Sequence, residues 1–197
     1  VDTPMPETPD LYCVSTSMHH YAKGVAYAAM KQFTEAESQK TCFYDSLQRI
    51  SPTRKFFNNP ALQTLGVGEK MLLGELEYHK GNHETAFEHL REAVQRSDSL
   101  HYSEPWPWMH PPRHALGALL MAQGQQAEAA KVYREDLGLS DTVLRCAQHP
   151  NNVWALHGLV ECLTNRGETE ESGEFTTLLD SALNKADFAV TSSCCCR

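Results

Sequence analysis

Residues 114–133, HALGALLMAQGQQAEAAKVY, decide how the rest of this sequence is interpreted. Apolar residues recur at helical spacing before Gly124 and again after it, which predicts two amphipathic helices joined by a glycine turn. Gly117 lies in the middle of the first helix, where glycine costs about 1 kcal/mol relative to alanine. We expect such a glycine where a second helix approaches closely, and we place Ala129 of that helix at the contact. The stretch therefore predicts a tightly packed helix-turn-helix unit.

The same pattern occurs three more times along the chain. It is found in residues 20–37 (HYAKGVAYAAMKQFTEAE), residues 72–93 (LLGELEYHKGNHETAFEHLREA) and residues 154–175 (WALHGLVECLTNRGETEESGEF). The structural positions of the repeat are Gly24, Ala36, Gly74, Ala86, Gly117, Ala129, Trp154 and Gly158. In the first three units the glycine and the alanine are 12 residues apart, and the fourth unit has a longer turn. A single helix pair cannot bury its own apolar face, so we expect neighbouring units to stack.

Composition narrows the class of protein. Apolar residues make up 41% of the 197 residues and charged residues 21%, which is typical of a globular chain. The formal net charge of −8 argues against a nucleic-acid partner, because phosphate binding needs clustered Lys and Arg. No run of 18 apolar residues is present, so no membrane span is predicted. Seven cysteines without framework spacing favour a reducing, cytoplasmic setting.

The repeat resembles the tetratricopeptide pattern, in which Trp, Leu-Gly and Tyr precede Ala and Phe. Residues around LGALLMAQGQQAEAAKVYREDL and NNVWALHGL are similar to the C-terminal part of larger tetratricopeptide proteins of uncharacterised function. This resemblance implies an all-α fold, a right-handed α-solenoid of about four helix-turn-helix units. The units are placed at about residues 15–49, 67–97, 111–137 and 151–183, within a solenoid of residues 15–185. Residues 1–14 are expected to form an N-terminal extension and residues 186–197 a cysteine-rich tail.

The repeat is longer here than the family's usual length of about 34 residues. The mid-helix glycines are 50, 43 and 41 residues apart, so inserts are expected at about 50–66, 98–111 and 138–150. All three should lie on one edge of the solenoid, because each falls between the second helix of one unit and the first helix of the next. The inserts are rich in aromatic residues and histidine, as in SLHYSEPWPWMHPPRH at 99–114. Their Trp and Phe side chains either pack back onto the solenoid or contact a partner.

Two functions are compatible with these residues. The first is a protein-interaction scaffold that binds a partner peptide or protein through its concave face and the insert-bearing edge. Its candidate binding residues, some of them placed on the concave side by the family resemblance, are Tyr21, Glu75, Tyr78, Trp106, Trp108, His114 and Met121. The alternative is a metal-binding or metal-dependent enzyme with a divalent metal on His110, His114, His149 and His157, since imidazoles and carboxylates bind such ions. No catalytic motif is present, and isolated hydrogen-bonded histidines would also explain these residues.

The two ends of the chain carry further expectations. The chain begins at Val1 rather than Met, which suggests a processed protein or a fragment. The first unit begins without an obvious polar capping helix, so we expect a further N-terminal domain or self-association through that end. The triplet Cys194-Cys195-Cys196 is compatible with lipidation or with a redox-sensitive tail, and no function is assigned to it.

Overall fold

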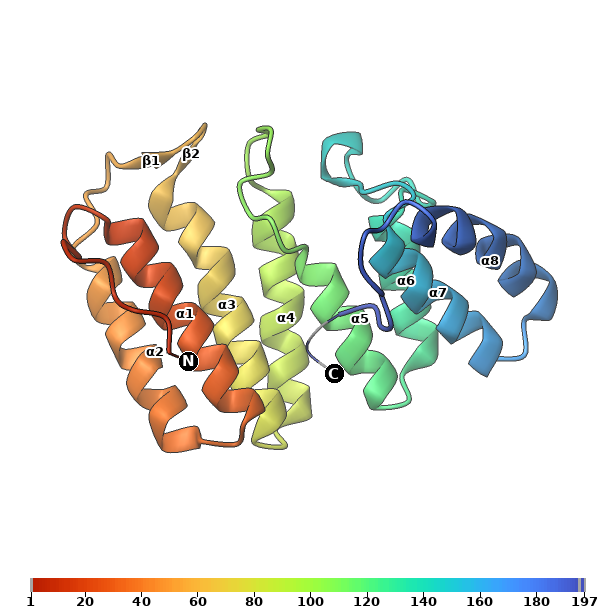
Figure 1. Ribbon diagram of the computed structural model, residues 1–197, viewed down its shortest axis with the longest axis horizontal. Helices are drawn as coiled ribbons and strands as arrows, with labels where there is room; N and C mark the ends of the chain where they lie inside the picture. The colour runs from red at the N-terminus through yellow and green to blue at the C-terminus, as the bar shows by residue number, and fades with distance from the viewer. Residues whose placement is uncertain (1, 195, 197) are drawn as a thin grey trace. The chain divides into compact units, whose positions relative to one another are not determined.

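The computed structural model describes residues 2–194 and 196, and it is dominated by α-helices (Figure 1). The helices of the described chain are α1 (Cys13–Ala29), α2 (Phe33–Leu47), α3 (Ala61–His79), α4 (His83–Asp98), α5 (Pro112–Ala122), α6 (Gln126–Asp136), α7 (Val153–Asn165) and α8 (Thr169–Leu183). A short 3-10 turn occupies Arg145–Ala147. The two-residue strands β1 (Lys55–Phe56) and β2 (Asn59–Pro60) form a small antiparallel pair. The prediction of an all-α fold is confirmed.

The chain divides into two compact units, residues 1–109 and residues 110–197. The first, here called the N-terminal unit, contains α1 to α4, and the second, the C-terminal unit, contains α5 to α8. In each unit consecutive helices pack as pairs, α1 with α2 and α3 with α4, then α5 with α6 and α7 with α8. The division falls inside the second predicted insert.

Positive-φ residues end the first helix of each pair. Gly81 (φ +90°), Gly124 (φ +73°) and Gly167 (φ +75°) follow α3, α5 and α7, and each has the left-handed conformation that glycine adopts without steric penalty. After α1 the same position is occupied by Lys31 with φ 59°. The turns predicted around Gly81, Gly124 and Gly167 are therefore confirmed, and the first turn uses the same geometry without glycine.

In the N-terminal unit the two repeat glycines have different neighbours. A Cβ atom at Gly74 would lie 2.6 Å from Cγ of Leu90 and 3.3 Å from the backbone oxygen of Ala86, both on α4. Gly74 thus permits the predicted close crossing of α3 and α4. A Cβ atom at Gly24 would instead lie 2.6 Å from Cδ1 of Leu72 on α3. It would also lie 3.6 Å from Cβ of Gln39 on α2, so Gly24 adjoins its partner helix and leaves room for Leu72 of α3 as well.

In the C-terminal unit both repeat glycines contact one aromatic ring. A Cβ atom at Gly117 on α5 would lie 2.5 Å from Cζ of Tyr133, and one at Gly158 on α7 would lie 2.6 Å from Cε1 of the same ring. Tyr133 belongs to α6 and is fully buried. Gly117 has the predicted partner helix, and the atoms nearest to a Cβ at Gly158 also belong to α6, the second helix of the preceding pair. The reason is the size of Tyr133, whose ring fills the space between α5 and α7.

Burial agrees with the repeat at its alanines and departs from it at Trp154. The three repeat alanines have no exposed surface: Ala36, Ala86 and Ala129. Trp154 keeps 37% of its surface exposed, although the repeat assigns it a structural position. It lies in the first turn of α7, two residues after the N-cap Asn152, where the helix has not yet entered the core.

The helix boundaries shorten the first insert. The helix α3 begins at Ala61, whereas the repeat places the start of this unit at residue 67. Pro60 precedes it with φ −56° and ψ 131°, an extended conformation that suits a proline before a helix. Ala61, Leu65 and Leu72 are buried on one face of α3, so its first turns belong to the core. No helix within the described residues is long and apolar enough to cross a membrane.

Candidate functional site

The first two inserts of the N-terminal unit are joined by a buried asparagine. Asn59 has no exposed surface, accepts a hydrogen bond from the backbone N–H of His101 at 2.7 Å, and donates from Nδ2 to the His101 carbonyl at 2.8 Å. Asn58 donates from Nδ2 to the Tyr102 carbonyl at 2.9 Å. These bonds hold residues 58–59 against residues 101–102, so the first two inserts lie side by side as predicted. The third insert belongs to the C-terminal unit.

The two tryptophans of the second insert behave differently. Trp108 is 7% exposed and packs edge-to-face on Tyr21 of α1, with ring centroids 5.3 Å apart. Gly68 of α3 makes room for it, since a Cβ atom there would lie 2.7 Å from Cη2 of the indole. Trp106 keeps 41% of its surface exposed. Trp108 therefore packs back onto the helices and anchors the insert, while Trp106 remains on the surface.

Several of the exposed large apolar side chains lie on the inserts. In the N-terminal unit they are Phe57, Tyr102, Trp106 and Met109, between 41% and 67% exposed. In the C-terminal unit the third insert carries Leu139 and Leu144, at 52% and 72%. Large apolar side chains clustered on loops mark contact surfaces more often than side chains scattered singly over helices.

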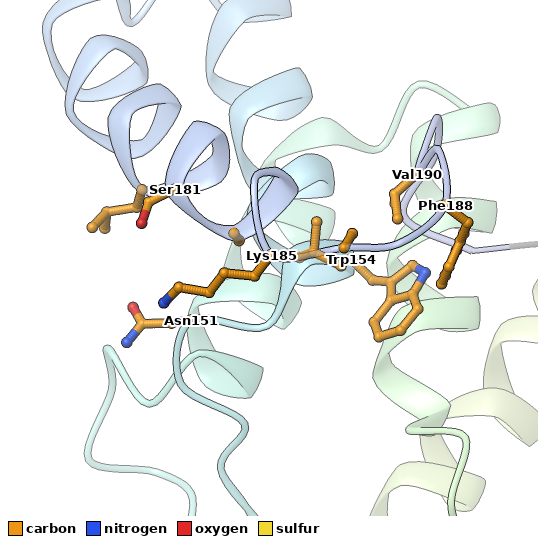
Figure 2. A pocket seen from close by; sticks show the side chains of 10 residues that line it. Asn151, Trp154, Ser181, Lys185, Phe188 and Val190 are labelled. Atoms are coloured by element: carbon orange, nitrogen blue, oxygen red, sulfur yellow. The ribbon is translucent and has the colours of Figure 1, made fainter.

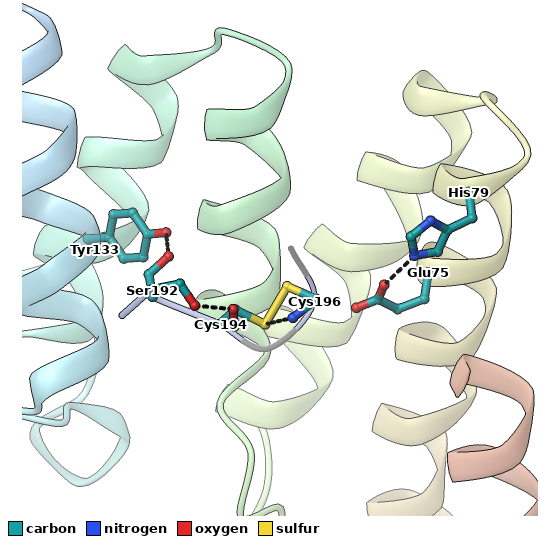
Figure 3. Close-up of a disulfide and its surroundings, with 7 residues drawn as sticks. Glu75, His79, Tyr133, Ser192, Cys194 and Cys196 are labelled. Atoms are coloured by element: carbon teal, nitrogen blue, oxygen red, sulfur yellow. Dashed lines mark hydrogen bonds and ion pairs between the residues drawn. A yellow bond between two sulfur atoms is a disulfide. The ribbon is translucent and has the colours of Figure 1, made fainter. Parts of the chain in front are cut away.

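A carboxyl group is buried in the N-terminal unit. Glu75 of α3 is 3% exposed, and its Oε2 lies 3.7 Å from Nε2 of His79 one turn later (Figure 3). Burial raises the pKa of Glu75 to about 7. Burial, and secondarily the nearby Glu75 carboxyl, raises the pKa of the Tyr21 phenol. The neighbouring candidate Tyr78 packs its ring against His83 at 4.9 Å and Phe87 at 6.2 Å.

Replacing Glu75 with glutamine is expected to stabilise the protein at pH 8, by about 1 kcal/mol, and to change little at pH 4.5. The folded state binds the Glu75 proton more tightly than the unfolded state, so stability falls as pH rises from 4.5 past the folded-state pKa of about 7. Glutamine has no charge to desolvate. Thermal denaturation across this pH range measures the effect, with the exposed Glu88→Gln as control. A stability difference that does not change with pH would contradict this account.

Asp136 organises the insert edge of the C-terminal unit. Its carboxylate is fully buried and accepts hydrogen bonds from His114 Nε2 at 2.9 Å, His149 Nδ1 at 2.8 Å and Asn152 Nδ2 at 2.9 Å. Its backbone carbonyl accepts from the backbone N–H of His149 at 2.6 Å. Although burial opposes it, these hydrogen bonds and the adjacent imidazoles hold the pKa of the Asp136 carboxyl well below its usual range. One carboxylate thus joins α5, the third insert and the start of α7.

Asn152 extends this network into α7. It is the N-cap of that helix, and its Oδ1 accepts from the backbone N–H of Ala155 at 2.8 Å. The next residue but one, Trp154, has its ring 6.2 Å from that of His114. The network therefore fixes where α7 begins and where the Trp154 indole lies.

The structure brings together part of the predicted metal set. The ring centroid of His114 lies 6.5 Å from that of His110 and 6.5 Å from that of His149. Nε2 of His114 and Nδ1 of His149 are occupied by Asp136. Burial, and then His114, lowers the pKa of His110. Over residues 2–194 and 196, no group of three or more His, Cys, Asp or Glu side chains has a metal-binding arrangement.

Four of the predicted partner-binding residues are withdrawn from the surface. Glu75, Trp108, His114 and Met121 are each at most 7% exposed. Met121 accepts a contact from the Cys162 thiol, and His114 and Trp108 have the partners described above. These side chains point into the packed units because they lie on helix faces or loops that pack against neighbouring helices. Each of these four side chains is therefore covered within its own unit rather than presented at the surface.

The C-terminal unit contains an open pocket of about 410 Å³ (Figure 2). The start of α7, the end of α8 and the segment after it contribute the lining: Asn151, Val153, Trp154, Leu178, Ser181, Ala182, Lys185, Ala186, Phe188 and Val190. Figure 2 shows the Lys185 side chain directed toward Asn151, with Trp154, Phe188 and Val190 grouped at the other end. Lys185 is the only charged residue in this lining.

Comparison with known proteins adds no family to this geometry. No protein-family model matches the chain, and no curated protein or solved structure matches it significantly.

A second pocket, of about 470 Å³, lies in the N-terminal unit between residues 3–6 and α1. The expected N-terminal extension therefore packs against the first helix. His19 and Lys23 line this pocket, and the pKa of His19 is lowered by burial and by Lys23.

Sequence reasoning missed the residues that organise both insert edges. Asp136 lies in the charged run REDLG, which resembles a solvated helix end, and nothing local indicates that three donors converge on it. Asn152 offered a usable signal, because asparagine before an apolar helical stretch is a common N-cap. Asn59 had no such signal, since its partners are 42 residues away.

Proposed function

We propose that this chain is a tetratricopeptide-type repeat protein that binds a partner protein or peptide through its insert-bearing surfaces. The paired helices, the left-handed turns after α3, α5 and α7, and the close crossings at Gly74 and Gly117 support this assignment. Within each unit, two hairpins of this kind form a rigid support for the loops between them. We also propose that the helix pairs form a right-handed solenoid and that the protein is cytoplasmic.

The observation that carries the function is the distribution of exposed apolar side chains. The inserts expose Trp106 and Met109 in one unit and Leu139 and Leu144 in the other. The loops that carry these side chains are held in place. Asn59 and Trp108 fix the loop with Trp106 and Met109, and Asp136 fixes the loop with Leu139 and Leu144. Apolar groups held on fixed loops lose little conformational entropy on binding, which favours affinity.

The metal-dependent alternative has less support in this geometry. His114 Nε2 and His149 Nδ1 are both hydrogen-bonded to the Asp136 carboxylate. These bonds explain the two histidines as structural residues. The scaffold proposal also needs no catalytic group. It requires only an exposed, pre-organised contact surface, and the inserts provide one.

A displayed library of random peptides, selected against the purified chain, tests the proposal. We expect selected peptides to bind the parent and to lose about 30-fold in affinity to the double variant Trp106→Ala with Met109→Ala, since a central aromatic anchor is worth about 2 kcal/mol. The control is Met30→Ala, which removes an equally exposed apolar residue from the turn after α1. Titration calorimetry measures both affinities, with thermal denaturation to show that both variants are folded.

Two results would contradict the proposal. One is a library that yields no peptide above background. The other is a set of peptides whose affinity is the same for the insert double variant and the parent.

A further inference from the structure

The pocket of the C-terminal unit has one polar end and one apolar end. Lys185 and Asn151 provide the polar end, and Trp154, Phe188 and Val190 provide the apolar end (Figure 2). Three of the lining residues are large apolar side chains with substantial exposure, namely Trp154 at 37%, Leu178 at 44% and Phe188 at 60%. A volume of about 410 Å³ accommodates one or two side chains of a ligand, and apolar walls with few polar groups are typical of binding pockets.

The charge at this pocket is uncompensated. Lys185 is exposed and makes no ion pair or side-chain hydrogen bond with any residue that the structure describes. No Asp or Glu lines the pocket. The chain as a whole has a net charge of −8. The pocket differs from it, because its one charged lining residue is the cation Lys185. A carboxylate placed beside Lys185 would gain a charge-assisted hydrogen bond, with the Asn151 amide nearby as a second donor.

The main chain beside the pocket is unpaired. The backbone groups of residues 187–191 make no hydrogen bonds with the part of the chain that the structure describes. Phe188 and Val190 line the pocket, whereas the residues between and after them do not, so alternate side chains face it. Unpaired N–H and C=O groups next to a side-chain pocket suit an extended peptide, which can add main-chain hydrogen bonds to its side-chain contacts.

Both walls of the pocket are held in place. The segment after α8 is fixed by a 2.6 Å hydrogen bond between the hydroxyls of Tyr133 and Ser193, both fully buried. Just beyond it, Cys194 and Cys196 form a disulfide, while Cys195 lies outside the described residues. On the opposite wall, Asn152 and Asp136 fix the start of α7 and with it Trp154. The pocket therefore exists before a ligand arrives.

We propose that this pocket binds an extended peptide segment of a partner in which an acidic side chain adjoins a large apolar one. The carboxylate lies on Lys185, and the apolar side chain lies against Trp154, Phe188 and Val190. The inference rests on the proposed function and names one site and one ligand chemistry for it. It is distinct from the exposed apolar surface of the inserts.

Four terminally blocked ten-residue peptides test the ligand chemistry. They share a Ser/Gly-rich frame and differ at a central pair, which is Leu-Glu, Leu-Gln, Leu-Lys or Ser-Glu. Chemical-shift titration of the ¹⁵N-labelled full chain gives the affinities and the residues affected. We expect Leu-Glu to bind most tightly, with shifts at residues 151–154 and 178–190. Replacing Glu with Gln should weaken binding about fivefold, as for a solvent-accessible ion pair, and replacing Leu with Ser about tenfold or more.

Variants of the chain test the assignment of the two ends. Lys185→Gln should weaken the Leu-Glu peptide about fivefold and leave the Leu-Gln peptide unchanged. Phe188→Ala should weaken both peptides, and because Phe188 is 60% exposed, the variant should remain folded. Lys131→Gln is the control, since Lys131 is an exposed cation of the same unit outside the pocket.

The outcomes separate this inference from the proposed function. Equal affinity for Leu-Glu and Leu-Lys, or no change on Lys185→Gln, would overturn the carboxylate site. Shifts confined to residues outside 151–154 and 178–190 would overturn the pocket itself. If these peptides fail while library peptides still depend on Trp106 and Met109, the pocket inference is wrong and the proposed function stands. Failure of both sets would reject both.

Discussion

Replacing Asp136 with alanine should destabilise the C-terminal unit by about 3–5 kcal/mol, the range measured when one partner of a buried charged network is removed. Three side-chain donors, on His114, His149 and Asn152, would lose their acceptor in a site with no exposed surface. Each unpaired buried donor costs about 1–3 kcal/mol, so water entry or local rearrangement must limit the total. The conservative variant Asp136→Asn should also lose most of this stability, because its amide group offers one acceptor oxygen where the carboxylate offers two.

The effect of Asp136 should depend on pH with a definite sign. Its folded-state pKa lies below the ordinary value of 3.8, so the stability it contributes is present above about pH 4 and is lost as the pH falls below that value. Parent and Asp136→Ala should therefore differ most at neutral pH and converge in acid.

Hydrogen exchange measured peptide by peptide is the suitable method for this variant, because the chain divides into two compact units and it reports on each unit by itself. Faster exchange is expected in α5, α6 and α7, with little change in α1 to α4. The matched control is Asp141→Ala, an exposed aspartate of the third insert. An Asp136→Ala protein with the same exchange as the control would show that the network does not stabilise the unit.

Gly117→Val is the second large effect, with an expected loss of about 3 kcal/mol, the upper end of the range for an overpacked core. Even a single added methyl group would lie 2.5 Å from Cζ and 2.7 Å from Cε1 of Tyr133. The ring cannot move away easily, because Gly158 is in contact with it from α7 and its hydroxyl is bonded to Ser193. Either α5 must shift relative to α6, or Tyr133 must leave its position in the core.

The chain supplies a matched control for this variant. Gly173, in the middle of α8, has nothing within 4 Å of the position where a Cβ atom would lie. Gly173→Ala should therefore be neutral or stabilise the protein by up to about 1 kcal/mol, since alanine is the better helix former. Urea denaturation followed by circular dichroism compares the two. If Gly117→Val unfolds at the same urea concentration as the parent, the close contact with Tyr133 is not present in solution.

The sequence predicted the local elements well and the partners of individual residues less well. Helices and turns follow from apolar periodicity and glycine position, which are local properties, so the turns at Gly81 and Gly124 could be located. The neighbours of Gly24 and Gly158 could not be predicted, because they depend on which large side chain of another helix fills the space beside the glycine. That side chain is Leu72 at Gly24 and Tyr133 at Gly158. Periodicity identifies a face of a helix, but it does not identify the helix that covers it.

The candidate site shows the same limit. The buried Trp108 and the exposed Trp106 have similar proline-rich surroundings in the sequence. The contacts that distinguish Trp108, with Gly68 and Tyr21, come from distant helices. The clustering of His114 and His149 was predicted, but the reason for it was not. From the sequence alone, a metal ion and a buried aspartate are equally suitable partners for two imidazoles. Asp136 is 13 residues from His149 and 22 residues from His114 along the chain.

The single ring of Tyr133 has a consequence for how this protein can change over generations. The ring fits because two residues beside it have no side chain: Gly117 in its own hairpin and Gly158 in the next hairpin. The two hairpins of the C-terminal unit are therefore not interchangeable modules, although each has the form of a repeat. A hairpin that carried alanine or a larger residue at the position of Gly117 or Gly158 could not replace either one, because its side chain would overlap the ring. Accepted substitutions at 117, 133 and 158 should therefore occur together, as a set of three, across any lineage that keeps this packing.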